Sequence, residues 1–356
     1  MSYVNLYIRN LQRVKFHESR RNVLRLDMNE SPTGLPEAFV EAVKQKITPA
    51  LLAMYPEKDA LQKLLAKHLG RKEEEISITA GADEAMRLVF QCFGEPGRTM
   101  LAAAPTFEMY GVYAKMFGMQ QISAQYDANL MLPIEALVER IAGGVSLVAV
   151  LNPDSPIGTR RSKAELEHVL ATAKAHGAIV ILDETYSGFG EVQSGLDLID
   201  KYENLLVLRT FSKLWALAGL RIGYAVGSSA LIHYLENASS TFNVNSIALL
   251  FAEALLRRPQ IVEQMQQSEA AGHAWLAEKM RKADYPVRSE GGNYLLFRPR
   301  RDSTRLVVAL KEKGVWIRDY SRGAVKGWAR VTTGERALME RFWHALWELD
   351  GEESGT

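Results

Sequence analysis

Up to about residue 243, short runs of apolar residues alternate along the chain with longer amphipathic segments. Residues 163–176 form one such segment, in which Leu166, Val169 and Leu170 lie on one stripe and so predict a helix. Most of the short runs have Gly, Pro, Asp or Asn close by, which is typical of strands buried on both faces. The strands predicted in this way cover residues 76–79, 100–104, 147–151, 178–182, 205–208 and 222–226.

Strands that alternate with helices predict an α/β fold. Right-handed crossovers would place these strands in a mostly parallel sheet with helices on both faces, which is a three-layer arrangement. We expect this large domain to cover residues 31–245.

The pattern changes near residue 243, and a smaller α+β domain is expected over residues 246–356. We also expect an N-terminal arm, residues 1–30, to pack with this smaller domain. The smaller domain's predicted elements are a long helical region over 246–283, strand-like pieces at 294–297 and 315–318, and a final helix from Glu335.

The composition restricts the classes of partner. The 43 Lys and Arg residues against 42 Asp and Glu residues leave a net charge of +1, which argues against nucleic acid as a partner. No stretch approaches the roughly 20 apolar residues of a membrane span. The single cysteine, Cys92, excludes an internal disulfide, and the seven histidines show no metal-binding spacing. We therefore expect a soluble, cytoplasmic protein that binds no metal.

One run carries the most informative residues for chemistry, Thr210-Phe-Ser-Lys-Leu-Trp-Ala-Leu-Ala-Gly-Leu-Arg-Ile-Gly-Tyr224. It places Lys213 among small and apolar residues, and desolvation lowers the pKa of an ammonium group, as a nucleophilic lysine requires. Thr210, Ser212 and Arg221 could converge on one phosphate dianion. For an isolated Ser-Lys pair, the alternative is an exposed lysine at a strand end and an arginine in a surface ion pair.

The whole run resembles the lysine segment of fold-type-I pyridoxal 5′-phosphate (PLP) enzymes, and among these it is most similar to the histidinol-phosphate aminotransferase family. The resemblance implies that PLP is the cofactor and that Lys213 holds it as a Schiff base. It also implies that this lysine then acts as a general base on the substrate Cα proton. The resemblance covers most of the chain, and the further motifs occur in the family's order.

A second motif, Asp183-Glu-Thr-Tyr186, follows the predicted strand 178–182. In the family this aspartate pairs with the protonated pyridine nitrogen, and this tyrosine hydrogen-bonds to the phenolate oxygen. A carboxylate against that nitrogen keeps the ring cationic, so that the ring can take up electrons from a carbanion at Cα. Taken alone, Asp183 could equally cap a following helix.

The motif Gly81-Ala-Asp-Glu84 follows the predicted strand 76–79 and opens a predicted helix. A glycine turn into a helix presents free backbone N–H groups to an anion. The resemblance assigns Gly81, Ala82 and Asp83 to the cofactor phosphate, and a plain helix start is the alternative.

Two tyrosines also match family positions. Tyr110, in Pro105-Thr-Phe-Glu-Met-Tyr110, would stack on the pyridine ring. Tyr55, in Met-Tyr-Pro, would reach the phosphate in the neighbouring subunit, which implies an obligate homodimer with shared active sites. Each tyrosine could instead belong to the hydrophobic core.

The resemblance also identifies substrate-binding candidates. Arg330 falls where the family places an arginine that forks onto the substrate carboxylate, a task that suits a planar guanidinium. Asn29 and Glu30 match an Asn-Glu signature at the entrance to the site. Arg318 and Arg322 could receive a second anion, such as a substrate phosphate, or could be surface residues.

One loop departs from the family pattern. Asn152-Pro-Asp-Ser-Pro-Ile-Gly158 has Ser155 where the family has an asparagine that donates to the phenolate oxygen, and Asp154 precedes it. A serine is shorter by the amide group, so the contact would be lost or mediated by water. The change is either tolerated drift in an ordinary aminotransferase or a retuning toward a PLP-dependent lyase, decarboxylase or cyclase.

We expect, first, an aminotransferase that moves an amino group between an L-amino acid or a phosphorylated amino alcohol and a 2-oxo acid. For histidinol phosphate, which lacks a carboxylate, Arg330 would face the substrate phosphate. The lyase, decarboxylase or cyclase remains the alternative hypothesis at this stage.

Overall fold

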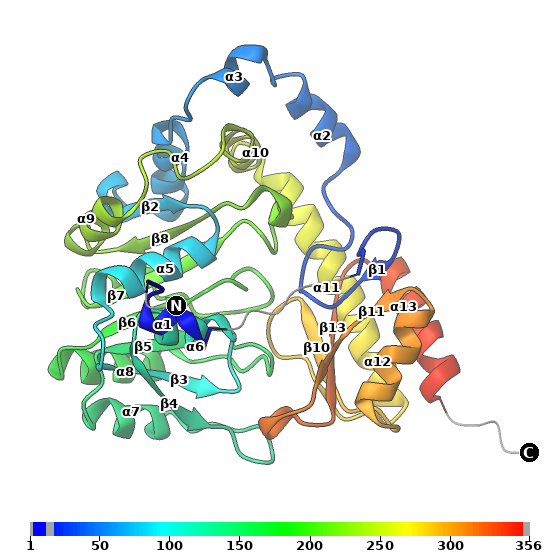
Figure 1. Ribbon diagram of the computed structural model, residues 1–356. Helices are drawn as coiled ribbons and strands as arrows, with labels where there is room; N and C mark the ends of the chain where they lie inside the picture. Colours follow the sequence, from blue (N-terminus) through cyan, green and yellow to red (C-terminus); the bar gives the residue numbers. More distant parts are fainter. Residues whose placement is uncertain (1–2, 12–17, 352–356) are drawn as a thin grey trace, which may run out of the picture.

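The computed structural model describes residues 3–11 and 18–351, and a seven-stranded sheet forms the centre of its larger part (Figure 1). The strand order is β2-β8-β7-β6-β5-β3-β4. β8 is antiparallel to both neighbours and every other neighbouring pair is parallel, which confirms the expected α/β fold. The strands are β2 Ile76–Thr79, β3 Thr99–Ala104, β4 Gln120–Gln125, β5 Leu147–Leu151, β6 Ile179–Asp183, β7 Leu205–Thr210 and β8 Gly223–Gly227.

The strands predicted from apolar runs are all present, with small differences at their ends. β4, by contrast, was not predicted. It lies at the edge of the sheet, and most of its residues, Gln-Gln-Ile-Ser-Ala-Gln, are exposed to solvent. An edge strand need not be apolar on both faces, so it lacks the signal that identified the others.

Helices cover both faces of this sheet (Figure 1). Ile181 and Leu206 belong to a core shared with α5, α6 and α9, whereas Val180 and Val207 point to a core shared with α4, α7, α8 and α10. Within residues 3–11 and 18–351, no helix combines the length and apolar character needed to cross a membrane. The helices of the larger part between α1 and α11 have the following bounds: α2 Glu37–Lys44, α3 Pro49–Ala53, α4 Asp59–Leu69, α5 Ala82–Phe93, α6 Met109–Met116, α7 Glu135–Ala142, α8 Lys163–Ala175, α9 Ser229–Ala238 and α10 Ser246–Leu256.

A second, antiparallel sheet of four strands forms the smaller part, in the order β12-β13-β10-β9. Its core contains Leu295, Phe297, Met339 and Phe342. β13 was not predicted, because Arg330 interrupts its apolar residues. The elements are α11 Pro259–Lys282, β9 Val287–Arg288, β10 Tyr294–Phe297, α12 Ser303–Glu312, β11 Val315–Trp316, β12 Arg318–Tyr320, β13 Trp328–Thr332 and α13 Arg336–Asp350.

The helical region expected over 246–283 is two helices, α10 and α11, because Pro259 starts a new helix at its first position. α10 packs against α4, and its apolar residues join the core of the large sheet. We therefore propose that the division between the two parts follows α10, rather than preceding it at residue 245.

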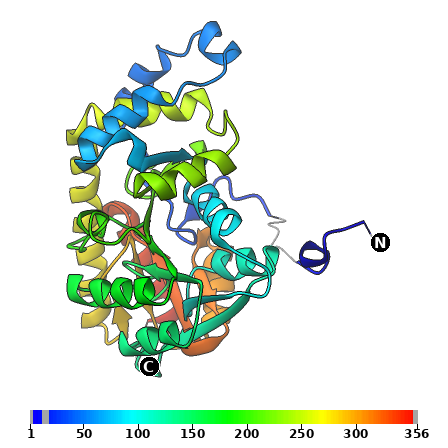
Figure 2. The same cartoon turned by 90° about the vertical axis from the view of Figure 1, so that its left-hand side faces the viewer.

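The N-terminal arm has two separate locations. β1, Leu24–Arg25, pairs in parallel with β11 of the smaller part, and Leu26 is buried in the core of that part. α1, Leu6–Arg9, instead contacts α6 of the larger part. It lies at the edge of the molecule, near the N-terminus (Figure 2). The pairing of β1 with β11 positions residues 27–30 above the edge of the large sheet at which β6 and β7 end.

Candidate active site

The two strongest sequence motifs meet at one edge of the large sheet. Asp183 is the last residue of β6, Thr210 is the last residue of β7, and Lys213 follows in the next loop. β6 and β7 are adjacent and parallel. Their carboxyl ends therefore open onto one crevice, the place where open α/β sheets bind ligands.

Lys213 carries a partly buried amine in this crevice. Its Nζ donates a hydrogen bond to the carbonyl oxygen of Met28 over 2.9 Å and lies 5.8 Å from the centre of the Tyr186 ring. Burial lowers the pKa of Lys213 below its ordinary value, and the positive charge of Arg330 acts in the same direction. The environment thus disfavours the charged ammonium form, which is the direction of pKa shift that the sequence predicted.

Asp183 is a buried carboxylate held by neutral donors. Its Oδ2 accepts a hydrogen bond from the Tyr110 hydroxyl at 2.9 Å, and its Oδ1 accepts one from the Thr185 N–H at 3.0 Å. Burial raises the pKa of Asp183 above its ordinary value. No cation of the described residues forms an ion pair with it, so a cationic group in the crevice would find an oriented partner.

Tyr186 is fixed by the N-terminal segment. Its hydroxyl accepts a hydrogen bond from Asn29 Nδ2 at 2.7 Å. Asn29 is itself held by Thr332, which accepts from its backbone N–H at 2.9 Å and donates to its Oδ1 at 3.1 Å. Asn29 and Tyr186, both site candidates from the sequence, are therefore brought together.

Gly81 and the start of α5 form a cradle for an anion. Gly81 has a φ of +80°, and the helix begins at Ala82, so the N–H groups of Ala82 and Asp83 have no acceptor within the helix. The Arg221 guanidinium covers the turn: a Cβ on Gly81 would lie 2.9 Å from Arg221 Nη2. Arg221 Nη2 also donates to Asp83 Oδ2 at 3.3 Å. Backbone donors, helix dipole and guanidinium thus converge at one point.

The hydroxyl groups of β7 and its loop take different positions. Thr210 Oγ1 accepts a hydrogen bond from the Ser212 N–H at 3.0 Å and lies 3.5 Å from the carbonyl oxygen of Ile222. Thr210 therefore shapes the turn that leads to Lys213. Ser212 is buried in this turn beside the crevice.

Arg330, on β13, contributes a guanidinium that lies against two tyrosine rings. Its Nη2 donates to the Asp27 carbonyl oxygen at 2.8 Å, and its Nη1 donates to Ser155 Oγ at 3.3 Å. The ring centres of Tyr294 and Tyr320 lie 5.5 Å and 6.0 Å from Cζ of the Arg330 guanidinium. Its Nε is buried without a hydrogen-bond partner in the described chain. An anion placed here would satisfy a donor that the protein leaves unpaired.

The loop that departs from the family pattern turns its aspartate away from Lys213. Asp154 Oδ2 accepts from the Tyr126 hydroxyl, and Oδ1 accepts from the N–H groups of Ile157 at 3.3 Å and Gly158 at 3.2 Å. Burial raises the pKa of Asp154 to about 6. Ser155, in contrast, contacts Arg330. The aspartate therefore stabilises the loop and does not place a charge in the crevice.

The side chains of two sequence candidates form their contacts with residues that were not candidates. Glu30 forms ion pairs with Arg20 at 3.1 Å and with Arg25. Tyr55 is 75% exposed on the loop after α3 and stacks on Phe242, with ring centres 4.2 Å apart. Within this chain, Tyr55 therefore belongs to the surface.

Tyr294 was missed as a site residue. Its ring packs edge-on against Tyr186, with the ring centres 5.2 Å apart, and its hydroxyl donates to the Asp154 carbonyl oxygen. It thereby connects the Asp154 loop, Tyr186 and Arg330. Its only signal in the sequence was its place at the start of the predicted strand 294–297, which indicates a core residue equally well.

Comparison with known proteins identifies related chains over nearly the whole length. The model of the family described as aminotransferase class I and II matches residues 21–346. Histidinol-phosphate aminotransferase 1 of Cupriavidus pinatubonensis is 31% identical, over 90% of this chain and 86% of its own. Histidinol-phosphate aminotransferase of Thermoanaerobacter pseudethanolicus is 28% identical, over 91% of this chain and 92% of its own.

Solved structures have the same fold. Histidinol-phosphate aminotransferase from Clostridium acetobutylicum superposes with a TM-score of 0.83, at 23% identity, over 92% of this chain and 99% of its own. The enzyme of that name from Sinorhizobium meliloti, solved in complex with pyridoxal-5′-phosphate, has a TM-score of 0.81 at 22% identity, over 91% of this chain and 90% of its own.

Proposed function

The chain belongs to the aminotransferase class I and II family, and we propose that its reaction moves an amino group from an anionic amino donor to a 2-oxo acid. It is a PLP-dependent aminotransferase. The observation that carries the proposed reaction is the placement of Asp183 and the Lys213 loop at the ends of adjacent parallel strands, with the Arg330 guanidinium close enough to act on the Lys213 amine. The relatives favour amino transfer over elimination, decarboxylation or cyclisation, so that alternative is not proposed.

The residues of the crevice fit the cofactor. We propose that the phosphate binds at the Gly81 turn, where the free N–H groups of α5 lie beside Arg221 and where a side chain at position 81 would clash with that guanidinium. Asp183 ends a buried strand and forms no ion pair in the described chain, as a partner for a protonated ring nitrogen requires. When bound, PLP supplies an aldehyde that condenses with amines and a ring that takes up electrons from the substrate Cα.

We propose the following roles for the chain's own groups. Lys213 would bind the cofactor and then take the proton from the substrate Cα, because its lowered pKa makes it available as a base. Asp183 would hold the proton on the ring nitrogen. Tyr186, with Ser155 beside it, would bind the phenolate oxygen, and Tyr110 would lie along the ring. Gly81, Ala82, Asp83, Thr210, Ser212 and Arg221 would surround the phosphate.

We propose that the amino donor carries a carboxylate or a phosphate for Arg330. Arg318 is the register partner of Arg330 on β12, so their side chains leave the same face of the smaller sheet. The Arg318 side chain is 39% exposed and lies 4.0 Å from Glu108, which leaves it able to turn toward a dianion. Asn29 would border the same entrance, with the ion-paired Glu30 beside it. The relatives' names make histidinol phosphate the first donor to test, with its phosphate at Arg330.

The direct test is turnover with L-histidinol phosphate and 2-oxoglutarate. The proposal predicts glutamate and an oxidised donor in equal amounts, and Lys213→Ala should abolish the reaction. A matched variant is Lys201→Ala, which removes an exposed lysine at the surface. Release of ammonia or carbon dioxide without formation of glutamate would contradict the proposal.

We also propose a homodimer in which Tyr55 serves the neighbouring active site. Supporting this, Leu52, Met54 and Tyr55 are exposed together around α3, which extends from the body of the molecule (Figure 1). A mixture of Lys213→Ala and Tyr55→Ala proteins tests it, because one of the two sites in a mixed dimer would regain both residues. Activity that appears only after mixing is expected, and a monomer in sedimentation would contradict the proposal.

A cytoplasmic location is likewise our proposal. It is supported by the single cysteine, since proteins of oxidising compartments commonly depend on disulfides. Fractionation of the producing cells tests it, and recovery of the protein from a membrane or secreted fraction would contradict it.

A further inference from the structure

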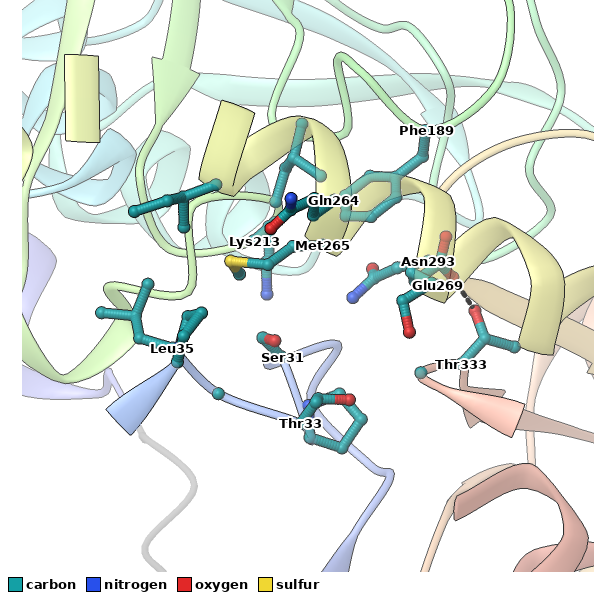
Figure 3. Close-up of a pocket in the computed structure, with 17 residues that line it drawn as sticks. Ser31, Thr33, Leu35, Phe189, Lys213, Gln264, Met265, Glu269, Asn293 and Thr333 are labelled. Carbon is teal, nitrogen blue, oxygen red and sulfur yellow. Dashed lines mark hydrogen bonds between the residues drawn. The ribbon is translucent and has the colours of Figure 1, made fainter. Parts of the chain in front are cut away.

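A cavity of about 320 Å³ lies beside Lys213, between the segment 31–36, α11 and the end of β13 (Figure 3). Asp183, Tyr186 and the Gly81 turn do not line it, so it is distinct from the crevice assigned to the cofactor. Lys213 connects the two. Most of its wall is apolar, from Pro32, Leu35, Pro36, Phe189, Leu214, Ile261 and Met265.

Glu269 is the one carboxylate among the residues that line this cavity. Its Oε1 accepts a hydrogen bond from the Thr333 hydroxyl at 2.5 Å, whereas its Oε2 accepts none from the described residues. The side chain is only 14% exposed. Burial raises the pKa of Glu269 to about 7. His273 Nδ1 lies 3.9 Å from Glu269 Oε1, but burial lowers the pKa of this histidine and so disfavours its cationic form. A hydrogen-bond donor bound in the cavity would supply the contact that Oε2 lacks.

The carboxylate is held in a fixed direction. The Thr333 hydroxyl that binds it also lies 3.2 Å from His273 Nδ1, and His273 Nε2 lies 3.1 Å from the Ser289 carbonyl oxygen. Glu269 and His273 are neighbours on α11, one turn apart. An acceptor positioned by a chain of hydrogen bonds in a mostly apolar wall is typical of a specificity site.

Lys213 and Glu269 do not contact each other. No hydrogen bond or ion pair joins them, although both line the cavity, and Asn293 lies between them in Figure 3. A molecule whose amine is at Lys213 must therefore extend across an apolar space before it reaches Glu269. Lys213 is the one cation in the lining, so the far end of the cavity disfavours a second anion.

We infer that this cavity receives the side chain of the amino donor, and that Glu269 selects a side chain with an apolar body and an N–H donor at its end, such as an imidazole. The inference rests on the proposed function, because it takes Lys213 as the site of the donor's amine. It adds a specificity-determining residue on α11, in a cavity that Arg330 does not line.

The test compares two donors that differ in one ring, the phosphate esters of L-histidinol and of L-phenylalaninol. Glu269→Gln keeps the size and the acceptor for Thr333 but replaces the free oxygen with an N–H donor. It should lower kcat/KM for histidinol phosphate by at least about tenfold and leave phenylalaninol phosphate within about twofold. Glu269→Asp, whose side chain is shorter by one methylene group, should show a smaller loss of kcat/KM for histidinol phosphate and no loss for phenylalaninol phosphate. Glu263→Gln, on the exposed side of α11, should change neither value.

A binding measurement separates this inference from the proposed function. Calorimetric titration of the cofactor-free protein with histidinol phosphate should give at least about tenfold weaker binding to the Glu269→Gln protein than to the wild type. If neither ester is turned over, the proposed reaction fails, and this titration alone decides the inference. Equal binding to both proteins, undetectable binding to the wild type, or equal losses of kcat/KM for the two esters would overturn it.

Discussion

The hydroxyl of Tyr110 donates a hydrogen bond of 2.9 Å to Oδ2 of Asp183. Tyr110 is fully buried, and burial raises its pKa well above the ordinary value, so it remains a donor at neutral pH. The sequence assigned this tyrosine a stacking role. In the structure, the Tyr110 hydroxyl also orients the Asp183 carboxylate, which is proposed to face the ring nitrogen of the cofactor.

Tyr110→Phe should therefore destabilise the protein. The substitution leaves Asp183 Oδ2 buried without its donor, and we expect the free energy of unfolding in urea to fall by about 1–3 kcal/mol. Tyr234→Phe, at a tyrosine that is 56% exposed, serves as the control and should stay within about 0.5 kcal/mol of the wild type. Equal stability of the two variants would show that the Tyr110 hydrogen bond contributes nothing to the free energy of unfolding.

Gly81→Ala should weaken PLP binding. Gly81 and Gly97 have nearly the same positive φ, +80° and +82°, but a Cβ on Gly97 meets nothing within 4 Å, whereas one on Gly81 would lie 2.9 Å from Arg221 Nη2. Both variants carry the backbone strain of roughly 1 kcal/mol, and only Gly81→Ala displaces the guanidinium. Equilibrium dialysis should give a higher PLP Kd for Gly81→Ala alone. The same Kd for both variants would contradict the proposal that the Gly81 turn binds the cofactor phosphate.

Asp154 should make stability depend on pH. Burial raises its pKa from 3.8 to about 6, so the folded protein retains a proton that the unfolded chain has lost. The folded state binds more protons in that window, and this contribution to stability is present below pH 3.8 and is lost as the pH rises through about 6. Between about pH 4 and pH 7, the wild type should lose up to about 3 kcal/mol of unfolding free energy relative to Asp154→Asn.

Unfolding curves of both proteins at several pH values measure this difference. The asparagine has nearly the same shape and keeps an acceptor for the N–H groups of Ile157 and Gly158, so the loop should survive. Parallel pH profiles for the two proteins would mean that Asp154 is ionised over the whole range.

Arg330→Lys should impair donor binding. A lysine cannot contact Ser155 and the Asp27 carbonyl oxygen together and also present a forked donor to an anion. We expect kcat/KM for the donor to fall by about 10–100-fold. Arg341→Lys, at an exposed position of α13, is the control. An unchanged kcat/KM for Arg330→Lys would place the donor's anion elsewhere.

The sequence predicted that Asp183 and Lys213 lie near each other because each follows a predicted strand. Asp183 comes directly after the apolar run 178–182, and Lys213 lies in the loop after the strand that contains the run 205–208. The carboxyl ends of parallel strands meet at one edge of the sheet. The positive φ of Gly81 is also a local property, set by a glycine between a strand and a helix. Such features depend on short stretches of chain, so a single sequence carries them.

The remaining features depend on contacts between distant residues. Asn29 meets Thr332 across 303 positions, and Glu269 meets Thr333 across 64. Neither pair has a periodic or local signal in the sequence. The side-chain direction of Asp154 depends in the same way on a distant residue, because its carboxylate accepts from the Tyr126 hydroxyl.

The most direct measurement concerns the amine of Lys213. Protein incubated with PLP is treated with borohydride, and the peptides are analysed by mass spectrometry. We predict a pyridoxyl group on Lys213, and no covalent cofactor in the Lys213→Ala protein, while Lys201→Ala is labelled like the wild type. A pyridoxyl group on another lysine, or no label on the wild type, would contradict the account.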